Sequence, residues 1–215
     1  METVLVLGST GLVGSLAVGY LAKTHARVVA LARRPSGNTW PANVEERVVA
    51  FDALSANDVV GFDHLACAIG STMKQAGSKD AFRAVDLDLP LRVATAAGVK
   101  RIALVSSVGA DASSRTFYLR IKGELEEALA ALPVEHLAIL RPSLLLGHRK
   151  DPRVGEAIAG AVAGVASAIL AGGLRKYRAI EADTVARALA KALVVPSSTK
   201  VSIHAYDGIR DLAHS

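Results

Sequence analysis

The chain has 215 residues, of which 51% are hydrophobic but only 4% aromatic, and its formal net charge is +5. This length and composition exclude a disordered chain, and we expect residues 1–215 to form a single α/β domain. The basic residues are scattered and are not interleaved with aromatic ones, so we expect no nucleic-acid partner. A lone cysteine, Cys67, excludes an internal disulfide and a cysteine-based zinc site, and we expect no bound metal.

The first elements are predicted to be a strand, a glycine-rich turn and a helix. The apolar run Val4–Leu7 predicts the strand, and apolar residues at helical spacing from Leu16 onwards predict the helix. In a turn of this kind, backbone amides and the positive end of the helix face a pyrophosphate. We therefore expect a dinucleotide to bind the whole turn, which consists of Gly8, Ser9, Thr10, Gly11, Leu12, Val13 and Gly14.

The second predicted strand, Val28–Leu31, is followed by Arg33 and Arg34. An NAD-specific protein usually carries an acidic residue here, which binds the adenosine ribose. Two guanidinium groups instead suit the 2′-phosphate of NADP(H), because they form charge-assisted hydrogen bonds with it. The sequence therefore favours NADP(H), although a pair of ordinary surface arginines would look the same.

Two more strands are predicted at Arg47–Phe51 and His64–Ile69. The residues after them should lie at the carboxyl edge of the sheet, along the path of the cofactor, although ordinary turn residues would fit the same pattern. The residues expected there are Asp52, Ala53, Gly70 and Ser71.

The middle of the chain continues the alternation of helices and strands. Helices are predicted at Asp80–Ala97 and Arg115–Leu132, and strands at Arg101–Ser107 and Val134–Leu140. This alternation predicts right-handed crossovers and a doubly wound parallel sheet, the architecture of an NAD(P)-binding Rossmann fold.

Tyr118 and Lys122 lie four residues apart on one predicted helix and therefore share a face. A neighbouring ammonium group favours the phenolate form of a tyrosine, which can then exchange a proton with a carbonyl oxygen. The preceding strand ends in Ser106 and Ser107, either of which could orient that oxygen. Together with the glycine turn, this set indicates a carbonyl reductase.

After Pro142 the regular alternation stops, and residues 142–181 are expected to form a small substrate-side insertion within the same domain. It includes Ala157–Leu170, an uncharged Ala/Gly segment that we interpret as a buried or subunit-packing helix rather than a membrane span. Such an apolar surface also suggests a homodimer. A helix at Asp183–Val194 and a strand at Val201–Ala205 complete the predicted elements.

Five segments carry a resemblance that covers nearly the whole chain: GSTGLVG, GVKRIALVSSVGAD, YLRIKGELE, RPSLLLG and ADTVARAL. In this order they resemble the atypical short-chain dehydrogenase/reductases, in particular the small NAD(P)H-binding proteins similar to human Tat-interactive protein. The resemblance implies that Tyr118 is the catalytic acid and base and that Lys122 both assists it and holds the nicotinamide ribose. It also implies that Ser107 or Ser106 positions the carbonyl, with Ser107 favoured.

The same resemblance assigns the segment after the sixth strand to the nicotinamide, and the residues concerned are Arg141, Pro142, Ser143 and Leu144. One position departs from the pattern. Many relatives have an asparagine in the helix before the fifth strand, whereas this chain has Asp86, so an asparagine-dependent proton relay is in doubt.

These observations predict an NADP(H)-dependent oxidoreductase that reduces a small carbonyl or enone. Two alternatives are an NADP(H)-sensing protein that acts through a protein partner and an enzyme related to sugar-nucleotide epimerases and dehydratases. The Ala/Gly run Ala157–Leu170 of the substrate-side segment offers few polar groups for a sugar nucleotide, which disfavours the second alternative. The N-terminus lacks the pattern of a secretory signal peptide, so a cytoplasmic protein is expected.

Overall fold

The computed structural model describes residues 2–147 and 172–215. Within them, seven strands form one parallel sheet in the order β3-β2-β1-β4-β5-β6-β9. The strands are β1 (Thr3–Leu7), β2 (Arg27–Ala32), β3 (Val44–Val48), β4 (His64–Cys67), β5 (Arg101–Val105), β6 (His136–Leu140) and β9 (Val201–His204). The order reverses between β1 and β4, which is the switch point of a doubly wound sheet, so the predicted fold class is confirmed.

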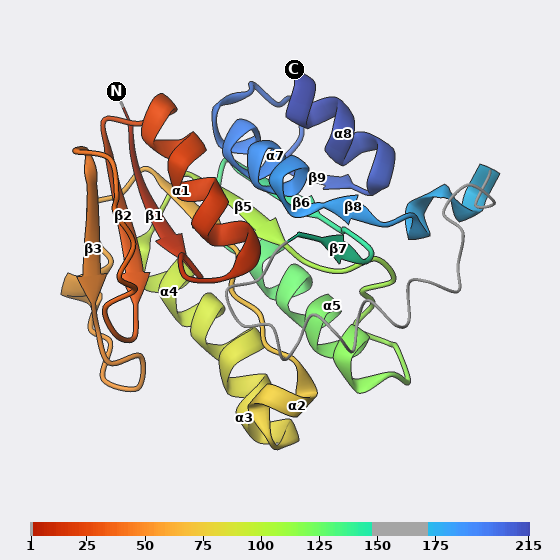
Figure 1. The fold of residues 1–215 in the computed structure, drawn as a ribbon. Coiled ribbons are helices and arrows are strands. Elements are labelled where there is room, and N and C mark those ends of the chain that lie inside the picture. Colours follow the sequence, from red (N-terminus) through yellow and green to blue (C-terminus); the bar gives the residue numbers. More distant parts are fainter. Residues whose placement is uncertain (1, 148–171) are drawn as a thin grey trace.

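Helices cover both faces of this sheet (Figure 1). Successive side chains of β1 alternate between the two layers, with Val4 and Val6 on one face and Leu5 and Leu7 on the other. The first face packs against α1 (Leu12–Thr24), α7 (Ala182–Val194) and α8 (Tyr206–His214), and the second against α4 (Leu89–Ala97) and α5 (Phe117–Ala130). Burial on both faces explains why the central strands are continuous apolar runs.

The long helix predicted at Asp80–Ala97 is divided into three parts. It begins as α3 (Lys79–Arg83), passes through a π-helical turn at Ala84–Asp88 and continues as α4, which ends at Gly98 with a φ of +59°. A short helix, α2 (Met73–Ala76), precedes it and was not predicted. The π-helical turn matters for the site, because it carries Asp86 into the interior.

The predicted third strand was wrong in its position. The sequence suggested Arg47–Phe51, whereas β3 runs from Val44 to Val48. Among the described residues, this strand is at the edge of the sheet and pairs only with β2, whose last residue, Ala32, lies opposite Val48. The ladder therefore ends with β2, and the apolar residues after Val48 belong to a loop.

Beyond β6 the chain forms a second, two-stranded parallel sheet from β7 (Leu145–Leu146) and β8 (Ile180–Glu181). The C-terminal helix α8 was missed by the sequence analysis, which ended at a strand. The helix predicted at Ala157–Leu170 lies outside the described residues. No helix in 2–147 or 172–215 combines the length and apolar character that crossing a membrane requires.

Candidate functional site

The glycine turn lies between β1 and α1, where its backbone packs too closely for side chains. Gly8 has a φ of +92°, and a Cβ on it would approach the carbonyl carbon of Ala68 to 2.5 Å. A Cβ on Gly14 would overlap the carbonyl oxygen of Gly8. Glycine is thus required at both ends of the turn, and the turn packs directly on the segment that follows β4.

The N-terminus of α1 fits an anionic ligand. Gly11 is the N-cap residue and provides no side-chain cap, and the first turn of the helix contains no acidic residue. Its first backbone N–H groups therefore have no intrahelical partner, and the helix dipole makes this end positive. A pyrophosphate would satisfy both features, so the residues present are compatible with a dinucleotide.

The side chains of the turn play different parts. Ser9 is fully buried and donates a hydrogen bond to the carbonyl oxygen of Leu31, 2.9 Å away, which ties the turn to β2. Val13 is buried in the core, whereas Thr10 is exposed. Ser9 and Val13 thus support the turn, and contacts from this segment to a phosphate would come mainly from its backbone amides.

Arg33 and Arg34 follow β2 directly and are exposed. Within the described part of the chain, neither guanidinium group forms a hydrogen bond or an ion pair, so both are available to an external anion. The loop after them is held by Glu46 of β3, which accepts hydrogen bonds from the backbone and hydroxyl of Ser36 and from the indole of Trp40. Burial raises the pKa of Glu46, but these hydrogen bonds outweigh it and leave the pKa below its ordinary value.

Asp52 and Ala53 do not follow β3 directly, because that strand ends at Val48. Both are exposed, and the Asp52 carboxylate accepts a hydrogen bond from the backbone of Ala53, at 3.1 Å. No hydrogen bond joins either residue to the glycine turn or to Lys122. The structure thus shows no hydrogen bond that joins these two to the other candidate residues.

Lys122 forms a buried ion pair with Asp86. The Lys122 Nζ lies 2.7 Å from Asp86 Oδ1, and the two side chains are 4% and 0% exposed. Ser71 completes the cluster, since its backbone N–H and its hydroxyl both donate to Asp86 Oδ2. A Cβ on Gly70 would lie 3.5 Å from both charged groups, so the pair packs against the segment that follows β4. The structure thus brings Gly70, Ser71 and Lys122 together.

Tyr118 lies one helical turn before Lys122 on α5, as the sequence predicts. Its ring packs against Phe82 with the ring centres 5.8 Å apart. Its hydroxyl forms no hydrogen bond with any described residue, so this phenol is available to a substrate.

The two serines after β5 have different surroundings. Ser106 is buried and donates its hydroxyl hydrogen to Glu126 of α5, whose carboxylate also accepts from Nε and Nη2 of Arg141. Ser107 is half-buried, and the one contact of its hydroxyl with a described residue is at 3.4 Å, to the carbonyl oxygen of the next residue, Val108. Ser107 is therefore the serine with a hydroxyl available to a ligand.

The segment after β6 is held by internal contacts. Pro142 is buried, and its carbonyl oxygen accepts a hydrogen bond from the backbone of Val108, at 2.9 Å. Ser143 donates its hydroxyl hydrogen to the carbonyl oxygen of Arg178, and Leu144 accepts from the backbone of Ile180. This segment is thus fixed beside the two serines.

Glu126 was missed by the sequence analysis, although a signal was present. It lies four residues after Lys122 and eight after Tyr118, so all three share one face of α5. An acidic residue on a helix face that otherwise carries buried or reactive groups needs a partner. Arg141 and Ser106 are those partners here.

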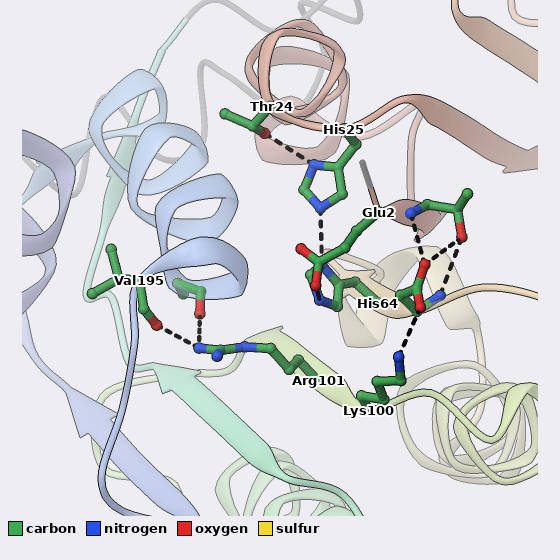
Figure 2. A network of polar contacts seen from close by, with 10 residues as sticks. Glu2, Thr24, His25, His64, Lys100, Arg101 and Val195 are labelled. Carbon is green, nitrogen blue, oxygen red and sulfur yellow. Dashed lines mark hydrogen bonds and ion pairs between the residues drawn. The ribbon is translucent and has the colours of Figure 1, made fainter.

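A second polar network lies at the opposite, amino edge of the sheet (Figure 2). There His25 Nε2 lies 2.9 Å from His64 Nδ1, and Glu2 approaches the other side of the His64 ring. Burial, together with the neighbouring His64, lowers the pKa of His25 to about 4. None of the residues proposed for the cofactor belongs to this network.

Comparison with known proteins shows which family the chain belongs to. A family profile described as NAD(P)H-binding matches residues 8–196. The rat protein HTATIP2 (Rattus norvegicus) is 33% identical over 211 residues, which cover 94% of this chain and 85% of the rat protein. The fold is similar to the crystal structure of human epimerase family protein SDR39U1 with NADPH, with a TM-score of 0.65 and 19% identity over 94% of this chain and 74% of that one.

The expected cytoplasmic location is contradicted by the names of other relatives. Protein FMP52 of Saccharomyces cerevisiae is named mitochondrial, and it is 37% identical over 161 residues, which cover 69% of this chain and 68% of that protein. Further FMP52 proteins carry the same description. The pattern of a secretory signal peptide carries no information about other cellular addresses.

The profile match covers most of the chain, and the glycine turn, the parallel sheet and the order of its strands are those of an NAD(P)-binding protein. This chain therefore belongs to the NAD(P)H-binding family, with a Rossmann fold of the short-chain dehydrogenase/reductase type.

Proposed function

We propose that this protein is an NADP(H)-dependent oxidoreductase in which Tyr118 exchanges a proton with a small carbonyl or enone substrate. The observation that carries the proposal is the hydrogen bonding of the Tyr118, Ser107 and Lys122 side chains. The Tyr118 hydroxyl forms no hydrogen bond with a described residue, and the Ser107 hydroxyl has a long contact with a backbone carbonyl oxygen. The neighbouring Ser106 instead donates to the carboxylate of Glu126.

The proposed roles follow from the number of hydrogen-bond donors available. The Lys122 ammonium has three N–H donors, and one is directed to Asp86. Two remain for the hydroxyls of a nicotinamide ribose and for the oxygen of Tyr118. Ser107 then orients the substrate oxygen, and Tyr118 donates its proton to that oxygen. NADPH, when bound, supplies a hydride.

The preference for NADP(H) rests on Arg33 and Arg34. Both guanidinium groups are exposed directly after β2, where an adenosine 2′-phosphate is expected in this fold. The attachment of the following loop to Glu46 through Ser36 and Trp40 restricts the positions that the arginines can take. A backbone that is fixed next to the two arginines reduces the conformational entropy lost when they bind a phosphate.

The proposal is tested first by titrating the protein with NADPH and NADH while the fluorescence of Trp40, the single tryptophan, is followed. Tight binding of NADPH with weaker binding of NADH is the expected result. Failure of both nucleotides to bind would refute the proposal.

The second step is a screen of small carbonyl and enone compounds, followed by the variant Tyr118→Phe. The variant keeps the ring that packs on Phe82 and removes only the hydroxyl. We expect it to bind NADPH normally and to lose about 10²- to 10⁴-fold in turnover. Unchanged turnover would exclude Tyr118 as the proton donor, and NADPH binding without any turnover would favour a sensing protein instead.

A further inference from the structure

The carboxylate of Asp86 is completely buried, and both of its oxygens accept hydrogen bonds. Lys122 Nζ donates to Oδ1 at 2.7 Å, and the backbone N–H and hydroxyl of Ser71 donate to Oδ2 at 2.9 and 2.6 Å. These contacts join three elements of the chain: the π-helical turn, helix α5 and the loop after β4. Asp86 thus fixes the position of the ammonium group and of the loop.

The chemistry of this cluster requires an acid at position 86. All three neighbours are donors, and an ionised carboxylate has acceptor sites on both oxygens. An asparagine has one oxygen and one NH₂ group. Its NH₂ group would face either the Lys122 ammonium or the Ser71 backbone N–H, and two donors cannot form a hydrogen bond with each other. The acid at a position where many relatives have an amide therefore matches this particular set of partners.

The cluster also lies beside the segment expected to bind the cofactor. A Cβ on Gly70 would lie 3.5 Å from both Asp86 Oδ1 and Lys122 Nζ. Two residues earlier, Ala68 is in close contact with Gly8 of the glycine turn. The backbone from 68 to 71 thus runs from the glycine turn to the Asp86–Lys122 pair, along the carboxyl edge of the sheet.

We propose that Asp86 is a positioning residue for the nicotinamide half of the cofactor. It holds the Lys122 ammonium so that its two remaining N–H donors face the nicotinamide ribose and the Tyr118 oxygen, and it holds the Ser71 loop beside the same sugar. The inference rests on the proposed function, because it needs NADPH to be the ligand. It adds a residue that acts through Lys122 and predicts which half of the nucleotide depends on it.

Two ligands separate this role from a general effect on the fold. NADPH contains the nicotinamide ribose, whereas adenosine 2′,5′-bisphosphate contains only the adenosine and its phosphates. In Asp86→Asn we expect NADPH to bind about tenfold more weakly, since a hydrogen bond to a charged group is perturbed. The bisphosphate should bind within about twofold of its affinity for the unaltered protein, because Arg33 and Arg34 are untouched.

The chain offers a matched control in Asp63, at the amino edge of the sheet. Its carboxylate accepts hydrogen bonds from the same kinds of donor, namely the backbone and hydroxyl of Thr3 and the ammonium of Lys100. Asp63→Asn therefore disturbs a similar cluster away from the candidate cofactor site. It should lower thermal stability and leave the ratio of the two affinities unchanged.

Ser71→Ala provides a second test, because it removes one hydroxyl donor and keeps both charges. We expect it to weaken NADPH by a few fold and to spare the bisphosphate. If Asp86→Asn does not fold, this variant decides the question by the same ratio of affinities.

The outcomes distinguish the two proposals. If NADPH binds equally tightly to the unaltered protein and to the Asp86 and Ser71 variants, the role of Asp86 is overturned, but the proposed function is not. Equal losses for NADPH and the bisphosphate would also overturn it, since Asp86 would then support only the fold. Absence of NADPH binding in the unaltered protein would refute the proposed function, and the role of Asp86 with it.

Discussion

The hydroxyl of Ser106 donates to the buried carboxylate of Glu126, across the contact between the end of β5 and helix α5. Arg141, from the end of β6, binds the same carboxylate through two of its nitrogens. Three elements are thus joined at the carboxyl edge of the sheet by one acid. Because Ser106 is held in this way, we assign the proposed catalytic role to the neighbouring Ser107.

The two serines should therefore respond differently to alanine. Ser107→Ala is expected to reduce turnover about 10²-fold while leaving thermal stability nearly unchanged, because it removes a donor to the substrate oxygen. Ser106→Ala should destabilise the protein by about 1–3 kcal/mol, because Glu126 loses one of its buried partners. Turnover and thermal melting of both variants are the measurements. The reverse pattern would assign the catalytic role to Ser106.

Cofactor choice should depend on the arginines after β2. Removing both with Arg33→Ala and Arg34→Ala should weaken NADPH by about 10- to 100-fold and NADH by much less, because only NADPH carries the 2′-phosphate. Arg27→Ala is a control with a related change in charge, since Arg27 begins β2 at the opposite edge of the sheet. Dissociation constants of both nucleotides are measured for each variant. Equal losses of NADPH and NADH in the double variant would show that the arginines do not recognise the 2′-phosphate.

Helix α1 contains two glycines that should behave in opposite ways. A Cβ on Gly14 would overlap the carbonyl oxygen of Gly8, whereas a Cβ on Gly19 would have no heavy atom within 4 Å. Gly14→Ala should therefore destabilise the protein by about 1–3 kcal/mol and distort the glycine turn. Gly19→Ala should stabilise it by up to about 1 kcal/mol through helix propensity.

Chemical denaturation and NADPH titration of the two variants check this prediction. Loss of nucleotide affinity is expected for Gly14→Ala only. A Gly14→Ala protein with normal stability and affinity would mean that the turn can relax, and that the close packing of Gly8 and Gly14 is not required.

The buried strands were predictable because each is apolar on both faces. Strand β1, with Val4–Leu7 fully buried, is an example. The edge strand β3 was misplaced because its sequence, VEERV, is half-exposed and charged, so its position depends on pairing with β2 rather than on its own pattern. Helix α8 was missed for a related reason, since its apolar residues are few and its formation depends on packing against α7 and β9.

The candidate site was predictable only in part, for a physical reason that the Asp86–Lys122 pair makes clear. The spacing of Tyr118 and Lys122 is a local property of one helix, so the sequence reveals it. The partner of Lys122 lies 36 residues earlier and is brought inwards by a π-helical turn. Contacts of this kind depend on how two helices pack, and periodicity along the chain carries no record of them.

The paired histidines at the amino edge of the sheet predict a loss of stability in mild acid. His25 is 2% exposed, and burial together with His64 lowers its pKa from 6.5 to about 4. Between these two values the unfolded chain binds a proton that the folded protein excludes, so the free energy of unfolding decreases as the pH falls. Burial also lowers the pKa of His64, and the two effects have the same sign.

We expect the free energy of unfolding to decrease by on the order of 2 kcal/mol between pH 7 and pH 4.5, as measured by urea denaturation. Hydrogen bonds from the Thr3 backbone and then from Lys100 hold the pKa of Asp63 at about 2, so this nearby acid stays ionised over the whole window. In His25→Gln, which keeps a polar partner for His64, the decrease should be smaller. Equal pH dependence in the two proteins would show that His25 does not resist protonation in the folded state, and that the acid sensitivity arises elsewhere.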